Sequence, residues 1–81
     1  MTIYLLKRSP HNEDFVLAGY ATTVDELELL ALLHAEEFYI GTLCAEVNMC
    51  EERVYVAEDG ELCMTFEIIA LEKIQKGDHN G

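Results

Sequence analysis

The spacing of apolar and polar residues changes twice along the chain, from strand-like to helix-like and back to strand-like. The first part holds two predicted strands, residues 2–7 and 15–21, which are rich in β-branched and aromatic side chains. Pro10 lies in the turn-forming segment between them, so we expect the strands to pair as a hairpin across a longer loop. Gly19 indicates a bulge or a close approach of another segment to the backbone.

A helix is predicted from Val24 to about Tyr39. Thr23, followed three residues later by Glu26, has the spacing of a capping box, and Gly41 supplies a stop signal. At about 100° per residue, seven positions fall on one stripe that we expect to face the core. These positions are Val24, Leu27, Leu30, Ala31, His34, Ala35 and Phe38.

Three leucines of this helix do not fit the stripe. Leu29, Leu32 and Leu33 fall on the side that carries the helix carboxylates. An exposed apolar run of this kind is expected to be buried against another part of the chain or against a partner. Either the sheet wraps far enough to bury it, or a partner chain covers it, because small domains often bury additional surface by oligomerising.

From Thr42 onwards the spacing has period two, which predicts strands over 42–50 and 53–57. In the first of these strands Leu43, Ala45, Val47 and Met49 point one way, and Thr42, Cys44, Glu46, Asn48 and Cys50 point the other way.

Asp59-Gly60 between two strand-like runs predicts a type I′ hairpin turn. That turn sets Ala57 opposite Leu62 and Tyr55 opposite Met64 on one apolar face. The last strand is expected to reach about Leu71, although residues 68–77 also fit a short helix. The opposite face of the hairpin is expected to carry Val54, Val56, Cys63, Thr65 and Glu67.

The element order β-β-α-β-β-β predicts the α+β class, with an antiparallel sheet and one amphipathic helix packed on one face. A length of 81 residues allows one domain, which we place at residues 1–76. Residues 77–81 are expected to form a flexible polar tail.

Catalytic and metal-binding motifs are not found in the sequence. Ser9 is the only serine, and the three cysteines show no C-x-x-C spacing or zinc ligand set. Cys44 with His34 is the remaining nucleophile pair, and it lacks a local signature. We therefore expect a protein without enzymatic activity, cofactor or metal, whose free thiols fit the reducing cytoplasm.

The net charge of the chain restricts the possible classes of function further. Sixteen acidic residues against five Lys and Arg give a formal net charge of −11, and residues 13–72 contain a single base, Arg53. Direct nucleic-acid binding is excluded, because it requires cations that displace counterions from phosphates. No apolar stretch is long enough to span a membrane. The acidic surplus serves either solubility or a contact surface, and ordinary soluble surfaces mix both signs.

Carboxylates that flank the helix and cluster at two predicted turns are the candidate partner-binding residues. They can imitate a row of phosphates and pair with Arg and Lys of a basic partner surface. These residues are Asp25, Glu26, Glu28, Glu36, Glu37, Glu51, Glu52, Glu58, Asp59 and Glu61.

In its size, its acidity and its lack of catalytic residues, the chain resembles the small acidic inhibitors of bacteriophages, which include anti-CRISPR proteins and nucleic-acid mimics. The resemblance implies an inhibitor that acts in the host cytoplasm. Such an inhibitor docks on the basic nucleic-acid-binding surface of a defence complex and blocks access of DNA or RNA. The alternative is a homo-oligomeric structural or regulatory module that associates, for example as a homodimer, through Leu29, Leu32 and Leu33.

Overall fold

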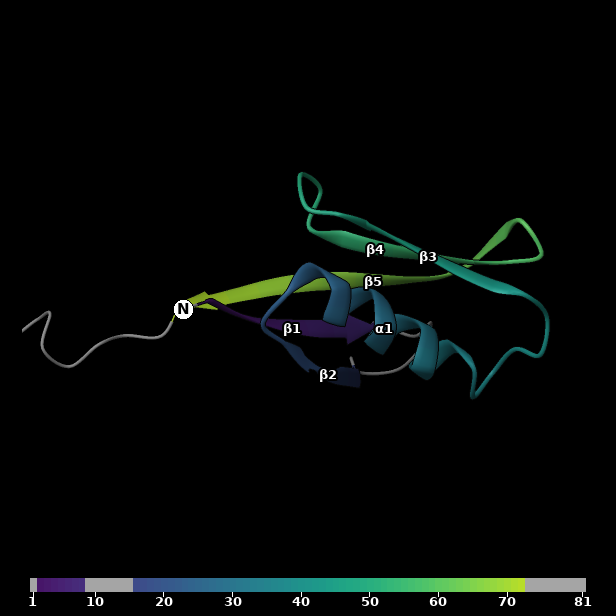
Figure 1. The fold of residues 1–81 in the computed structure, drawn as a ribbon, viewed down its shortest axis with the longest axis horizontal. Coiled ribbons are helices and arrows are strands. Elements are labelled where there is room, and N and C mark those ends of the chain that lie inside the picture. The colour runs from purple at the N-terminus through teal and green to yellow at the C-terminus, as the bar shows by residue number, and fades with distance from the viewer. Residues whose placement is uncertain (1, 9–15, 73–81) are drawn as a thin grey trace, which may run out of the picture.

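The computed structural model of the protein describes residues 2–8 and 16–72. Within these residues one antiparallel five-stranded sheet is covered on one face by one helix (Figure 1). The strand order across the sheet is β2-β1-β5-β4-β3, so the predicted α+β class and element order are confirmed. The elements are β1 (Thr2–Arg8), β2 (Val16–Ala21), α1 (Val24–Ala35), β3 (Leu43–Asn48), β4 (Arg53–Glu58) and β5 (Glu61–Glu72).

β5 is the central and longest strand, and it joins the two halves of the sheet (Figure 1). Its first half pairs with β4 and its second half pairs with β1. The prediction of a strand to about Leu71 is confirmed, and a helix beginning at residue 68 is wrong as far as Glu72. The predicted tail, residues 77–81, lies outside the described residues, as does the turn around Pro10.

The core lies between α1 and the sheet. The buried stripe of the helix is narrow, because only Leu27, Ala31 and Ala35 are fully covered. Val24 and Phe38, which the periodicity placed in the core stripe, are instead exposed, since they lie at and beyond the ends of the buried stripe. The buried residues are Leu6, Ala21, Leu27, Ala31, Ala35, Val54, Val56, Met64, Phe66 and Ile68.

The start of α1 is the predicted capping box. The backbone N–H of Glu26 donates to Thr23 Oγ1 over 3.1 Å. In return the backbone N–H groups of Thr22 and Thr23 donate to Glu26 Oε1 over 2.8 and 3.2 Å. Donors that would otherwise lack a partner at the helix start are thereby satisfied.

The end of α1 lies at Ala35, four residues before the predicted end at Tyr39. The backbone N–H groups of Phe38 and Tyr39 both donate to the Ala35 carbonyl, over 2.9 and 3.0 Å, so the chain turns off the helix axis. Tyr39 then reaches the sheet, where its hydroxyl donates to the Cys63 carbonyl over 3.0 Å. This tertiary contact competes with a further helical turn and explains the early end.

The β4–β5 hairpin has the predicted turn. Asp59 and Gly60 have φ values of 51° and 88°, the positive values that a type I′ turn requires. The predicted pairing of Ala57 with Leu62 is confirmed.

One pairing of this hairpin differs from the prediction. A register irregularity after Val56 sets Met64 opposite Val56, so Tyr55 faces Thr65 instead of Met64. Val54 and Val56 therefore point into the core, and the sequence had placed them on the other face. A bulge adds one residue to one strand. Beyond the bulge, side chains that uninterrupted pairing would place on one face of the sheet therefore lie on the opposite face.

Two smaller features concern the edge strands. The register between β1 and β2 shifts after Leu6, and a Cβ atom at Gly19 would lie 3.1 Å from Leu30 Cδ2. Gly19 thus sits beside a bulge and allows α1 to approach closely, as predicted.

β3 ends at Asn48, so Met49 is exposed in the following turn and does not point inward.

The capping box gives a first testable prediction. Thr23→Ala removes the acceptor of the Glu26 N–H and should lower the free energy of unfolding by about 1 kcal/mol. Thr22→Ala is the control, because the Thr22 hydroxyl donates to Glu26 but accepts nothing from the helix backbone. Urea unfolding followed by circular dichroism measures both variants, and an equal loss for both would contradict the assigned role of Thr23.

Candidate functional site

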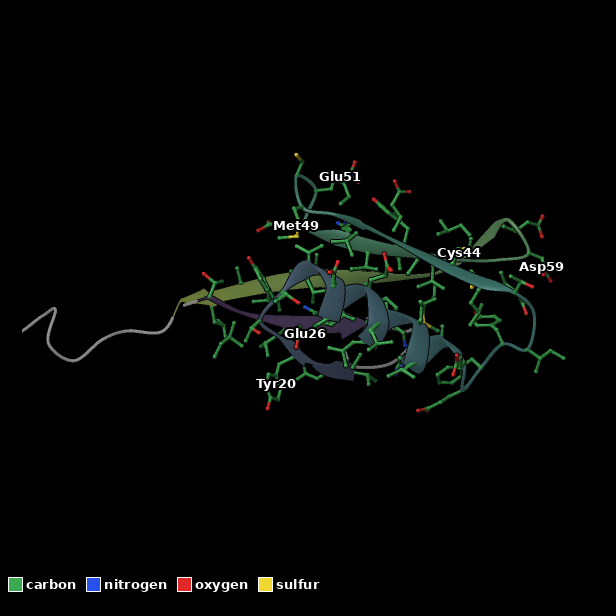
Figure 2. The ribbon with its side chains drawn as sticks, in the orientation of Figure 1. Tyr20, Glu26, Cys44, Met49, Glu51 and Asp59 are labelled. Carbon is green, nitrogen blue, oxygen red and sulfur yellow. The ribbon has the colours of Figure 1, made fainter. Side chains whose placement is uncertain are left out.

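The ten carboxylates predicted to bind a partner lie in three places: the outer surface of α1 with the two residues that follow it, the β3–β4 turn and the β4–β5 turn. Figure 2 marks one residue of each place, Glu26, Glu51 and Asp59. The two turns lie at opposite ends of β4, and α1 lies on the sheet between them (Figure 1). The carboxylates therefore lie along the helix and at both ends of β4.

Two carboxylates of the β4–β5 turn hold the segment that follows the helix. Glu58 Oε2 accepts from the Gly41 N–H over 2.8 Å, and Asp59 Oδ1 accepts from the Thr42 N–H over 3.0 Å. The Asp59 N–H in turn donates to the Thr42 carbonyl over 2.8 Å. A Cβ at position 41 would lie only 2.5 Å from Asp59 Oδ2, so a larger residue there would displace these carboxylates.

Two further carboxylates are engaged locally. Glu26 closes the capping box, and the hydrogen bonds from Thr22 hold the pKa of its carboxyl below the usual value. Glu51 Oε1 accepts from the Tyr55 hydroxyl over 2.6 Å, and this hydrogen bond raises the pKa of Tyr55. These carboxylates bond to neutral donors, so their negative charge is not compensated.

The other six carboxylates of the predicted set make no side-chain hydrogen bond or ion pair within residues 2–8 and 16–72. Because nothing in that part of the chain engages them, they are available to an external cation. They are Asp25, Glu28, Glu36, Glu37, Glu52 and Glu61.

An apolar ridge runs along the outer surface of α1. Leu29 and Leu33, one helical turn apart, are 56% and 51% exposed, so the sheet does not wrap far enough to bury them. By the helical period the carboxylates of α1 lie on both flanks of this ridge. Leu32, the third leucine of the predicted patch, is half-buried and faces the β3 side of the helix.

Beside Leu32 the surface is hollowed by about 510 Å³, between the end of α1 and the start of β3. Ile40 stands fully exposed at this hollow. Sequence reasoning missed Ile40, although an apolar run from Phe38 to Ile40 immediately before Gly41 was a usable signal. The lining residues are Leu32, Glu36, Tyr39, Ile40, Gly41 and Leu43.

Cations are absent from the helix, since residues 24–37 contain no Lys or Arg. The Arg8 guanidinium stacks over the Phe38 ring, 4.8 Å from its centroid. Lys7 pairs with Glu67 over 3.4 Å. The outer surface of α1 is therefore a region of one sign, with an apolar ridge inside it.

The structure keeps the Cys44–His34 pair apart. Cys44 is exposed on the sheet face away from α1, whereas His34 contacts the Phe66 ring in the core, with ring centroids 5.6 Å apart (Figure 2 labels Cys44). Within residues 2–8 and 16–72, Cys44, Cys50 and Cys63 are free thiols, and no three His, Cys, Asp or Glu side chains are grouped to hold a metal ion. α1, the helix of that same part, is too short to cross a membrane.

Comparison with known proteins found no match: no family model, no curated protein and no solved structure is significantly similar to this chain. The function of the acidic surface is therefore inferred from its own residues and their surroundings.

His34 gives a prediction on pH dependence. Burial, and secondly the positive charge of Arg8, lower the pKa of His34, against a smaller opposing effect of Glu37. Its Nε2 atom is buried and has no hydrogen-bond partner among the described residues. Below the unfolded value of about 6.5 the unfolded state then binds more protons than the folded state, so stability falls as the pH decreases.

The measurement is urea unfolding between about pH 7.5 and pH 5.5, above the range in which carboxylates titrate. We expect the wild-type protein to lose stability across this window, and His34→Phe to show a flatter profile. Identical slopes for the two proteins would contradict the role of His34.

Proposed function

We propose that this protein is a non-enzymatic acidic binding protein that docks the outer surface of α1 on a basic surface of a partner protein. The observation that carries the proposal is the apolar ridge of Leu29 and Leu33, which lies exposed among carboxylates that have no cation near them on the helix. A coat that served solubility alone would not require exposed leucines at its centre.

The two components of this surface have different effects on binding. Unpaired carboxylates such as Glu36 and Glu37 attract a basic partner, raise its association rate and disfavour acidic competitors. The exposed apolar side chains, Leu29, Leu33 and Ile40, provide the desolvated contacts that slow dissociation. A partner that fits has Lys and Arg around an apolar depression.

The narrower form of the proposal concerns the normal ligand of that basic surface. Surfaces rich in Lys and Arg bind the phosphates of nucleic acids, and carboxylates on a rigid helix can occupy the same sites. The protein then acts as an inhibitor that excludes DNA or RNA from its partner. A phage inhibitor directed at a host defence complex is the biological setting that the resemblance in size and charge suggests.

The alternative module, a homo-oligomer formed through Leu29, Leu32 and Leu33, is disfavoured by electrostatics. Two copies joined through α1 would bring the helix carboxylates of both chains against one another, and like charges across an interface are costly. Leu32 also faces the hollow beside β3 and does not share the exposed ridge. A basic partner would neutralise the helix carboxylates, whereas a second copy of α1 would add further negative charge beside them.

The proposal is tested by reversing single charges of matched exposure. Glu36 directly follows α1, beside the ridge, and Glu46 lies on β3, on the opposite side of the sheet, and both are exposed. Wild type, Glu36→Lys and Glu46→Lys are immobilised, and proteins captured from a cell extract at low salt are identified and then purified for affinity measurement. We expect Glu36→Lys to weaken partner binding about tenfold and Glu46→Lys to have little effect. Equal losses for the two variants would show that only total charge matters.

The inhibitor form makes a separate prediction. A short DNA or RNA duplex should compete with the protein for the purified partner, and binding of the protein should weaken steeply as salt increases. Fluorescence anisotropy of a labelled duplex measures the displacement. A partner that binds the duplex and this protein simultaneously would contradict the inhibitor form while leaving the docking surface intact.

A further inference from the structure

The sheet face away from α1, here called the open face, is apolar over β2, β1 and the second half of β5. On these strands most of the residues that alternate with the core positions are themselves apolar, and Lys7 and Glu67 are the charged ones. Tyr20, which projects from the edge strand in Figure 2, is 70% exposed, and Leu71 is 47% exposed. The apolar residues of the open face on these three strands are Ile3, Leu5, Leu17, Tyr20, Ile69 and Leu71.

Strand pairing arranges these side chains in rows across the sheet. Tyr20, Leu5 and Ile69 form one row, and Ile3 with Leu71 forms the next. An antiparallel sheet with one face in water normally alternates apolar and polar residues along each strand. In β1 and the second half of β5 both faces are apolar, which is typical of a sheet that is covered on both sides.

Charge indicates what covers the open face. The following row contains Lys7, Glu67 and Arg53, which alternate in sign across β1, β5 and β4. With Glu46 the strand residues of the open face have balanced charge, and Glu51 of the β3–β4 turn adds one carboxylate at its edge, beside Tyr55. A second chain on the open face therefore meets far less negative charge than it would on the helix side.

We propose that a second copy of this chain covers the open face, in a two-fold dimer that packs sheet against sheet. An axis that runs along the strands between β1 and β5 sets Leu5 against Ile69 of the second copy and Ile3 against its Leu71. The same axis sets Lys7 opposite Glu67 of the second copy. The face is thus complementary to itself, as a two-fold interface requires. The acidic α1 surfaces point outward on the two far sides of the dimer.

The face is of modest size. β1 has seven residues, β2 has six, and six residues of β5 pair with β1; at about 4.8 Å between strands and about 3.3 Å per residue they cover roughly 300 Å² on each copy. Two copies then bury about 600 Å², which is the size of a weak self-association. The helix ridge offers only Leu29 and Leu33 among carboxylates, so the open face is the better surface for self-association.

Sedimentation equilibrium over a range of concentrations tests the dimer. Reducing agent is present throughout, so that the exposed thiols of Cys44 and Cys50 cannot link copies. The test variant is Tyr20→Lys with Leu71→Lys on the open face. The matched control is Leu29→Lys with Leu33→Lys on α1, which makes the same change in charge at side chains of similar exposure. Circular dichroism confirms that each variant is folded.

We expect wild type and the α1 variant to be dimers and the open-face variant to dissociate at least tenfold more readily. Higher salt should tighten the dimer, because it screens the repulsion between two acidic chains. Salt weakens binding to a basic partner, so the two interactions are distinguishable. A wild-type protein that is monomeric up to about 1 mM, or a dimer broken only by the α1 variant, overturns the proposal.

An isotope-filtered NOE experiment on mixed labelled and unlabelled protein tests the geometry without any substitution. Contacts between the Leu5 methyl groups of one copy and the Ile69 methyl groups of the other are expected. A dimer whose contacts between copies come from α1 instead contradicts the sheet interface.

Discussion

The fold depends on the contact between one helix and one face of a five-stranded sheet. α1 buries a stripe of Leu27, Ala31 and Ala35, and the two alanines allow the helix backbone to lie close to the strands. A helix is about 10 Å wide, whereas five strands span roughly 20 Å, so one helix covers only the middle of the sheet. Tyr39 extends the cover toward β5, and Gly19 allows Leu30 to extend it toward β2.

This arrangement forces the other side chains onto two different surfaces. The helix side receives the carboxylates, because α1 has one buried stripe and a wide exposed arc. The open face receives the apolar residues of β1 and β5 that cannot reach the core, together with the alternating charges of Lys7, Glu67 and Arg53. One surface is suited to a basic partner and the other to a neutral, apolar one, so the two proposed interactions do not compete for space.

The negative charge of the helix side is preserved by the way the structure uses its carboxylates. Glu58, Asp59 and Glu26 accept hydrogen bonds from backbone N–H groups, which are neutral donors. Self-repulsion of this kind lowers the stability of a small domain, since no compensating cations are interspersed. An uncompensated acidic surface is therefore retained at a cost to stability, which is consistent with a surface that has a use.

The elements and their order follow from local patterns of residues, because capping, turn chemistry and hydrophobic period act over a few residues. Thr23 with Glu26 and Asp59 with Gly60 were predicted correctly for this reason. The carboxylates of the candidate site were also visible as a run of one sign, but their individual roles were not. Which of them bond to the backbone depends on segments that are distant in sequence, as with Glu58 and Gly41.

The faces of the strands and the end of the helix depend on packing in the folded molecule. The bulge opposite Val56 moved that residue into the core, and the hydrogen bond from Tyr39 to the Cys63 carbonyl favoured an end of α1 at Ala35. The apolar open face could not be predicted from the sequence either. In an unbroken apolar run such as residues 68–71, the sequence does not show which side chains face the helix and which face away from it. Period and propensity are local, whereas register and burial are set by contacts between segments far apart in the chain.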